Sequence, residues 1–253
     1  MSDFDRNYAP ARGAGADRAL AIDQGLRAYM LRVYNTMAMG VALTGVVAWL
    51  TFQAAVITNP AGGIVGLTAF GQAIFGGPAM IVLVLATLGL VFFISFRIQH
   101  LQVGTALALF LLYAGLVGLM FSSIFLAYTG ASITRTFFIS AASFGALSLY
   151  GYTTQRDLSP IGSFLIMGIF GLVLAMIVNI FLKSTGLDFV ISAIGVIIFA
   201  GMTAWDTQRI KEMYDPQEDG TATGRKAVVG ALQLYLDFIN LFMFLLRFLG
   251  DRR

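Results

Sequence analysis

Seven long apolar stretches, separated by short polar breaks, leave this chain few possible folds. Each stretch is close to the ~20 residues that an α-helix needs to cross ~30 Å of hydrocarbon. Only 11% of the 253 residues are charged and 58% are hydrophobic, whereas soluble domains carry about 25% charged residues. The sequence therefore predicts an all-α polytopic membrane bundle with seven transmembrane helices. The predicted spans cover about residues 30–52, 79–98, 102–128, 133–153, 161–182, 188–210 and 227–249.

The segments outside these spans are short. Residues 1–24 are polar and predict a flexible cytoplasmic tail without the early apolar core of a signal peptide, so the transmembrane bundle occupies residues 25–250. Residues 53–78 are rich in glycine and carry no charge. They fit an external loop or a shallow segment at the membrane interface, and the sequence leaves both open.

The distribution of Lys and Arg predicts the orientation, because cytoplasmic loops carry an excess of both. With the N-terminus inside, eleven of these residues fall on the internal side and two, Arg135 and Lys183, on the external side. The basic tail after the last span is an exception, and we expect that span to cross nonetheless rather than dip in and return. The internal residues are Arg6, Arg12, Arg18, Arg27, Arg32, Arg97, Arg156, Arg209, Lys211, Arg225 and Lys226.

Composition also excludes several kinds of chemistry. The chain has no cysteine, which rules out disulfides, thiolate catalysis and Cys-based metal sites. Its one histidine, His100, cannot build a zinc site or a catalytic triad alone. The net charge of +3 comes from basic residues at span ends and does not indicate nucleic-acid binding. We therefore expect neither an enzyme nor a cofactor.

The strongest chemical signal is a pair of acids inside the last two spans, at Asp206 and Asp237. An ionisable group at membrane depth costs roughly 2.5–3.5 kcal/mol on insertion scales, so it usually faces a bundle interior and serves a function. At about 100° per residue, Gln233, Asp237 and Asn240 share one side of the last helix, and Gln233 and Asn240 are candidate pore-lining residues.

The two acids are predicted to meet. The last two spans are antiparallel and joined by the polar hairpin 215–224. At 1.5 Å per residue, Asp206 lies ~12 Å and Asp237 ~16 Å from the internal boundary. Two carboxylates in contact cannot both stay ionised cheaply, so they share a proton, which makes the pair a pH sensor. Deprotonated, the pair is a candidate site for Ca²⁺. Alternatively, each acid is satisfied separately by a backbone group or an arginine.

Two further polar residues are candidates to act together with the carboxylate pair. Arg97 ends the second span, where it is either an orientation residue that reaches the interface or a latch that pairs with ionised Asp206. Asn179 lies within the fifth span. It is expected to hydrogen-bond between helices or to line a pore.

Two motifs then become recognisable. Gly-Met-Thr-Ala-Trp-Asp-Thr-Gln-Arg-Ile-Lys (201–211) and Leu-Tyr-Leu-Asp-Phe-Ile-Asn-Leu-Phe-Met-Phe-Leu-Leu-Arg-Phe-Leu-Gly (234–250) closely resemble the Bax inhibitor-1 family. The segment Gly-Leu-Arg-Ala-Tyr-Met-Leu-Arg-Val-Tyr-Asn-Thr-Met-Ala-Met-Gly (25–40) is similar to its bacterial branch. The resemblance covers essentially residues 22–250, and the chain departs from the family in its lengthened hairpin and in residues 53–78.

The resemblance implies a bundle in which six helices surround the hydrophobic seventh, in the inner (plasma) membrane of the cell. It also implies a pH-sensitive calcium leak controlled by a carboxylate pair on the last two helices. Asp206 and Asp237 occupy the matching positions, and the arginine of the family's second helix would fall at Arg97.

Three other functions compete with a leak channel. One is a non-conducting membrane protein that modulates a membrane protease, another membrane protein or a stress or cell-death pathway, which the resemblance also implies. A second is a proton-coupled transporter, disfavoured because the sequence shows no internal repeat. The third is an intramembrane protease, disfavoured because its Gly-Asp type motifs are missing.

Overall fold

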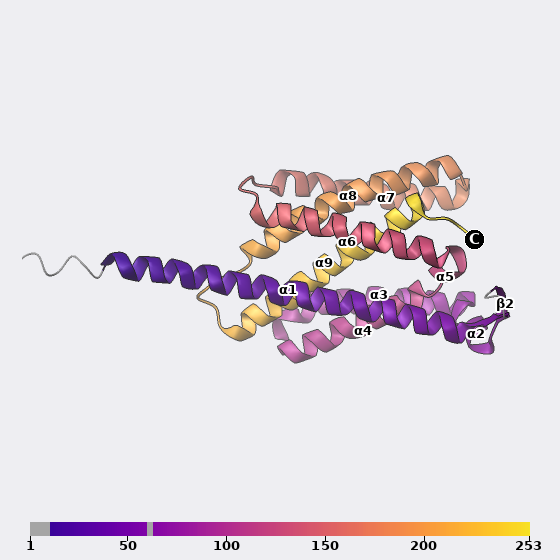
Figure 1. The fold of residues 1–253 in the computed structure, drawn as a ribbon, viewed down its shortest axis with the longest axis horizontal. Helices are drawn as coiled ribbons and strands as arrows, with labels where there is room; N and C mark the ends of the chain where they lie inside the picture. The colour runs from indigo at the N-terminus through magenta and orange to yellow at the C-terminus, as the bar shows by residue number, and fades with distance from the viewer. Residues whose placement is uncertain (1–10, 60–62) are drawn as a thin grey trace, which may run out of the picture.

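The apolar stretches fold as long α-helices that lie side by side (Figure 1). The computed structural model describes the backbone of residues 11–59 and 63–253, and side chains from residue 22 onward. Residues 1–10 of the predicted tail lie outside the described residues, and the first helix already begins at Ala11 within that tail. The long helices are α1 (Ala11–Ala55), α3 (Gly77–Arg97), α4 (Val103–Phe121), α6 (Gly130–Thr153), α7 (Ser159–Leu182), α8 (Thr185–Glu212) and α9 (Gly220–Leu249).

Six helical segments in the described part of the chain are long and apolar enough to cross a membrane. The segment predicted at 133–153 is not among them, although α6 is 24 residues long and lies within the bundle (Figure 1). Its buried face carries hydroxyl groups, which lower its hydropathy: Ser132, Thr136, Ser140 and Ser148. The fold is an all-α polytopic membrane bundle, and the seventh crossing stays a prediction.

The outer surface of the bundle is apolar. On α7, Phe164, Phe170 and Phe181 are 71%, 68% and 80% exposed. Apolar patches of this extent are rare on soluble monomers. In a bilayer the lipid tails cover them, so the chain is embedded in lipid.

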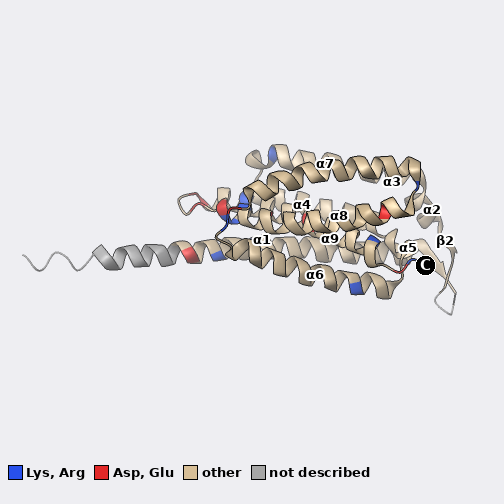
Figure 2. Cartoon of the chain, turned by 90° about the horizontal axis from the view of Figure 1, so that it is seen from above, with Lys and Arg blue, Asp and Glu red and all other residues tan. Residues whose placement is uncertain are grey.

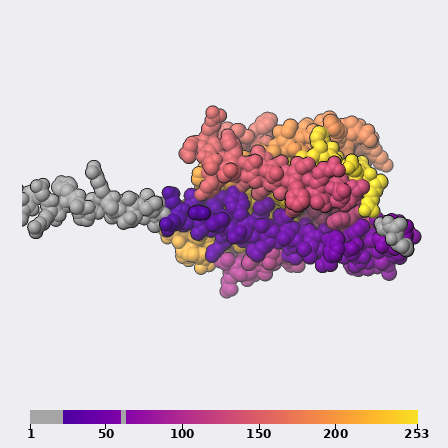
Figure 3. Space-filling model, viewed as in Figure 1, coloured from indigo at the N-terminus to yellow at the C-terminus, as the bar shows by residue number. Residues whose placement is uncertain are grey.

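Helix α9 occupies the centre. It packs against α1, α4, α6 and α8, and little of it reaches the surface seen in Figure 3. Two thirds of its membrane-length window (67%) is buried, against 11% for α3 and for α7. Helices α3 and α7 pack mainly on α4 and α8, so the expected ring of six helices around α9 is an inner group of four with two helices outside it.

Residues 53–78 are more ordered than the predicted loop. Strands β1 (Val56–Thr58) and β2 (Ile64–Leu67) form an antiparallel hairpin, and the short helix α2 (Ala69–Phe75) follows. The side chain of Thr68 accepts a hydrogen bond from the backbone N–H of Gly71 and so caps α2. This unit sits at the end of α1, where it leads into α3 (Figure 1).

Most charged residues gather at the end of the bundle from which α1 extends (Figure 2). We call it the hairpin end, because it holds the connection 213–219 between α8 and α9. The one-turn helix η2 (Ile98–His100) is tied to this end by a hydrogen bond from Arg225 to the carbonyl of Gln99. Likewise, Lys211 donates to the Tyr152 carbonyl over 2.9 Å. Basic side chains here satisfy carbonyls at helix C-termini, besides giving the charge bias that orients membrane proteins.

The C-terminal tail closes the opposite end. The backbone N–H of Thr129 donates to the Asp251 carbonyl and that of Arg253 to the Ala127 carbonyl, next to helix α5 (Ile124–Ala127). Arg252 pairs with Asp188 at 3.1 Å. Helix α9 is thus unbroken from the hairpin end to the opposite end, which fits a crossing helix and not one that dips in and returns.

Candidate functional site

Close helix packing brings α8 against its neighbours around Asp206. A Cβ at Gly151 of α6 would overlap the carbonyl of Ala204, and one at Gly230 of α9 would lie 2.9 Å from a methyl carbon of Ile210. Small residues at such positions let membrane helices approach closely. Asp206 on α8 is therefore held against both α6 and α9.

Asp206 and Asp237 meet in this packed region. Their side chains lie close enough for each to act on the charge of the other. They are 5% and 4% exposed, so both are sealed from bulk water in this conformation. Two ionised carboxylates cannot hydrogen-bond to one another, since neither has a hydrogen to donate. The geometry therefore suits a pair that holds one proton between its two members.

Two buried oxygens on α9 have no hydrogen-bond partner among the described residues: Oδ2 of Asp237 and Oε1 of Gln233. These residues are one helical turn apart, so both oxygens lie on the side of α9 that carries the acid. Buried acceptors without a partner are costly, and a proton or a cation would satisfy them.

The predicted latch is not formed. Arg97 is exposed in the last turn of α3, and none of the three ion pairs among the described residues includes it. Its position at the helix end turns the long side chain outward instead of toward Asp206. Arg209, one turn further along α8 than Asp206, is also exposed, and its guanidinium carbon lies 5.6 Å from the centre of the Trp205 ring.

The other predicted polar residues have local roles in this conformation. The side chain of Asn240 donates to the Leu236 carbonyl of its own helix over 2.8 Å. Asn179 accepts from the backbone N–H of Ser184 over 3.0 Å. Asn179 of α7 thus bonds to the N-cap residue of α8, and its pore-lining role stays a prediction. It closes the turn between α7 and α8, where Lys183 adopts a left-handed conformation (φ 49°).

A chain of hydroxyl groups beside Asp206 was not predicted from the sequence. Tyr34 of α1 bonds to Ser148 of α6 (2.6 Å), and Ser148 bonds to Thr207 of α8 (2.9 Å). Thr207 in turn donates to the Thr203 carbonyl. A sequence signal was present, because the serines and threonines of α6 recur on one helical face. Their partners on α1 and α8 could not be identified from spacing alone.

Two apolar cavities flank this region. One, of about 700 Å³, lies between α1 and α6 and includes Tyr34 and Ser148 in its wall. The other, of about 420 Å³, is lined by Thr44, Phe238 and Phe242 among others, toward the C-terminal tail. Neither acid lines either cavity. The carboxylate pair therefore opens into neither cavity.

At the hairpin end, Gln208 fixes the α6–α7 connection near the pair. It accepts from the backbone N–H of Leu158 (2.9 Å) and donates to the Arg156 carbonyl (2.8 Å). In that connection, hydrogen bonds from the backbone and side chain of Ser159 lower the pKa of the exposed Asp157 carboxyl. The second motif residue after Asp206 thus has a structural role.

Few other residues could hold a metal. In the part of the chain that the structure describes, no group of three or more His, Cys, Asp or Glu side chains could hold a metal ion. The pair alone supplies two carboxylates. A Ca²⁺ ion there would need further oxygens from backbone, amide or water, since Ca²⁺ takes six to eight ligands.

Comparison with known proteins matches residues 26–253 to the family model described as "Inhibitor of apoptosis-promoting Bax1". An uncharacterised protein of Rickettsia prowazekii is 48% identical over 91% of this chain and 92% of its own length. The inner membrane protein YbhL of Escherichia coli is 46% identical over 90% of this chain and 94% of its own length. An uncharacterised membrane protein of Streptococcus pyogenes is 35% identical over 90% of this chain and 94% of its own.

Proposed function

Because the chain belongs to the Bax inhibitor-1 family, we propose that it is a pH-sensitive calcium leak channel of the cell membrane, with its N-terminus in the cytoplasm. Asp206 and Asp237 control the pathway. The observation that carries this proposal is the proximity of two acids from consecutive helices, each about 95% buried and close enough to act on the charge of the other. Acids at this depth are energetically unfavourable, and in membrane proteins they occur mainly where they bind or transfer protons or ions.

The protonation of the pair sets how well it holds a cation. Fully protonated carboxyls bind Ca²⁺ weakly, since metal ligands must lose their protons. A fully ionised pair binds it strongly and releases it slowly. Conduction needs a site that is favourable enough to enter and weak enough to leave. Flux therefore passes through an optimum when the pair carries one proton.

Arg209 tunes this balance in place of the latch first expected at Arg97. A positive charge one helical turn from a carboxylate favours its ionised form, and Arg209 is one turn from Asp206. Loss of that charge makes ionisation of Asp206 less favourable. The profile of Ca²⁺ flux against pH therefore moves to higher pH. Arg97 is exposed and forms no ion pair among the described residues, so its loss leaves the profile in place.

The test is Ca²⁺ flux into liposomes that contain the purified full-length protein, measured with a calcium dye from about pH 6 to about pH 8. Wild type passes Ca²⁺ with a pH-dependent rate. Asp206→Asn and Asp237→Asn flatten the pH response, while Asp188→Asn, in the first turn of α8, keeps it. Arg209→Gln shifts the profile upward and Arg97→Gln does not. A wild-type profile in Asp237→Asn would sink the role of the pair.

The same experiment separates the second candidate, a non-conducting modulator of a membrane protease or of another membrane protein. This candidate has one observation in its favour: both acids are sealed from water in this conformation. A modulator passes no Ca²⁺ in liposomes at any pH.

A further inference from the structure

A small polar pocket at the hairpin end stands apart from the carboxylate pair. It has a volume of about 250 Å³ and lies between the cytoplasmic part of α1 and the α8–α9 connection. We call it the hairpin pocket. Its wall is formed by Gly25, Ala28, Tyr29, Arg32, Tyr214, Asp215, Pro216, Glu218, Gly220 and Thr223.

Two buried oxygens in this wall lack a hydrogen-bond partner among the described residues: the Tyr29 hydroxyl and Oε2 of Glu218. Tyr29 is only 3% exposed, so water outside the pocket does not reach its hydroxyl freely. The Tyr29 phenol also lies close enough to Glu218 to feel its charge. Two unpartnered oxygens therefore belong to residues that line one small space, Tyr29 on α1 and Glu218 in the connection.

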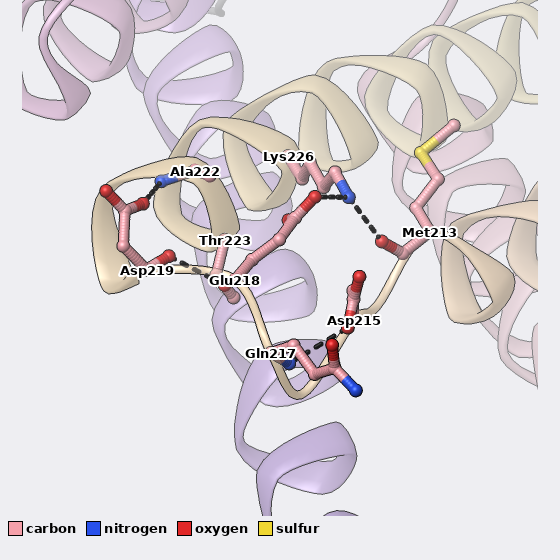
Figure 4. A network of polar contacts seen from close by, with 8 residues as sticks. All are labelled: Met213, Asp215, Gln217, Glu218, Asp219, Ala222, Thr223 and Lys226. Atoms are coloured by element: carbon pink, nitrogen blue, oxygen red, sulfur yellow. Dashed lines mark hydrogen bonds and ion pairs between the residues drawn. The ribbon is translucent and has the colours of Figure 1, made fainter.

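The connection is held by several polar contacts, which Figure 4 shows. The Lys226 ammonium lies between Oε1 of Glu218 (2.6 Å) and the Met213 carbonyl (2.9 Å). Asp215 accepts from the backbone N–H of Gln217 through Oδ1. These contacts use one carboxylate oxygen of each acid. They leave Oε2 of Glu218 and Oδ2 of Asp215 without a hydrogen bond among the described residues.

The chemistry of these oxygens favours a cation. The N-terminus of α9, which would attract an anion, already has its cap: Asp219 accepts from the Ala222 N–H over 2.6 Å. An anion would also meet Glu218 and Asp215. Carboxylates and hydroxyls are hard ligands, which suit Ca²⁺ or Mg²⁺ better than a transition metal. Arg32 and Lys226 oppose a cation, so binding would be weak.

We propose that the hairpin pocket binds a hydrated divalent cation of the Ca²⁺ class. The Glu218 and Asp215 carboxylates are its charged ligands, and the Tyr29 hydroxyl contacts it directly or through water. With two carboxylates the affinity falls in the weak range of Ca²⁺ sites, about 10⁻⁴–10⁻³ M. A bound cation would tie the α8–α9 connection to α1. Binding does not depend on the proposed leak.

Terbium luminescence tests the proposal on the purified full chain in detergent. Tb³⁺ replaces Ca²⁺ at oxygen sites and emits when a nearby tyrosine is excited. Tyr29 and Tyr214 face each other in the pocket region, with ring centres 5.6 Å apart. Wild type should show saturable emission that Ca²⁺ displaces. Glu218→Gln and Asp215→Asn should each weaken binding by about tenfold, because fewer charged ligands lower the affinity of Ca²⁺ sites.

Three variants make the test decisive. Asp219→Asn changes an acid of the same connection that does not line the pocket, and asparagine still caps α9, so binding should be unchanged. Asp237→Asn should also bind as wild type, which separates this site from the leak. Lys226→Gln removes the opposing ammonium and should tighten binding, a gain that misfolding cannot imitate. Emission that is insensitive to Glu218→Gln and Asp215→Asn, or weaker binding in Lys226→Gln, overturns the proposal.

Discussion

Helices α7 and α9 are both long enough to cross a membrane, yet they occupy opposite environments. Helix α7 is the more apolar of the two and has 11% of its window buried. Helix α9 carries Asp237 and Gln233 and has 67% buried. In lipid, apolar surface gains little by leaving the tails, whereas polar groups gain by meeting one another inside the bundle. The more polar helix is therefore the inner one, the reverse of a soluble protein.

The largest difference in stability between α9 and α7 should come from alanine substitutions at matched phenylalanines. Phe244 of α9 is 6% exposed and stacks on Phe199 at 5.6 Å, whereas Phe181 of α7 is 80% exposed. Phe244→Ala should lower the free energy of unfolding by about 3–5 kcal/mol because it opens a cavity. Phe181→Ala should change it by less than about 1 kcal/mol, since lipid fills the space. Unfolding in detergent by thermal or SDS titration measures both, and equal losses would break the comparison.

A matched pair of glycines extends the comparison of inner and outer helices to α6. Gly151→Ala forces a methyl group against the Ala204 carbonyl, so α6 and α8 must separate. It should cost about 1–3 kcal/mol. A Cβ at Gly171 of α7 meets nothing within 4 Å, so Gly171→Ala should be neutral or stabilise the helix by up to about 1 kcal/mol. The same unfolding titration applies; a tolerated Gly151→Ala would mean that α6 is not an inner helix.

The smallest difference in stability between α9 and α7 should come from the removal of single hydroxyl groups. The Tyr235 hydroxyl is buried in α9 and bonds to Thr44 over 2.7 Å. Tyr235→Phe should cost about 0.5–1.5 kcal/mol, the usual net value of one hydrogen bond. Ser163 of α7 is exposed and bonds only to its own helix, at the Ser159 carbonyl. Ser163→Ala should have no measurable effect on the unfolding midpoint.

The sequence was sufficient to predict the helical bundle. Each apolar stretch forms its backbone hydrogen bonds within its own helix, whatever its neighbours are. The meeting of Asp206 and Asp237 also followed from helix rise and an antiparallel connection. The direction of the Arg97 side chain could not be predicted from the sequence. An arginine at a helix end points inward or outward according to its neighbours, which spacing does not specify. The partners of Ser148 lie 114 and 59 residues away in sequence, so no local pattern could identify them.

The central position of α9 has a consequence for how the protein is made. Helix α9 follows α1, α4, α6 and α8 in the sequence, so these four helices leave the ribosome before the helix that they enclose. Until then their inward-facing hydroxyls, such as those of Thr44 and Tyr34, must be shielded by lipid, by one another or by the insertion machinery. Burial of these hydroxyls is thus completed only when the central helix of the bundle arrives.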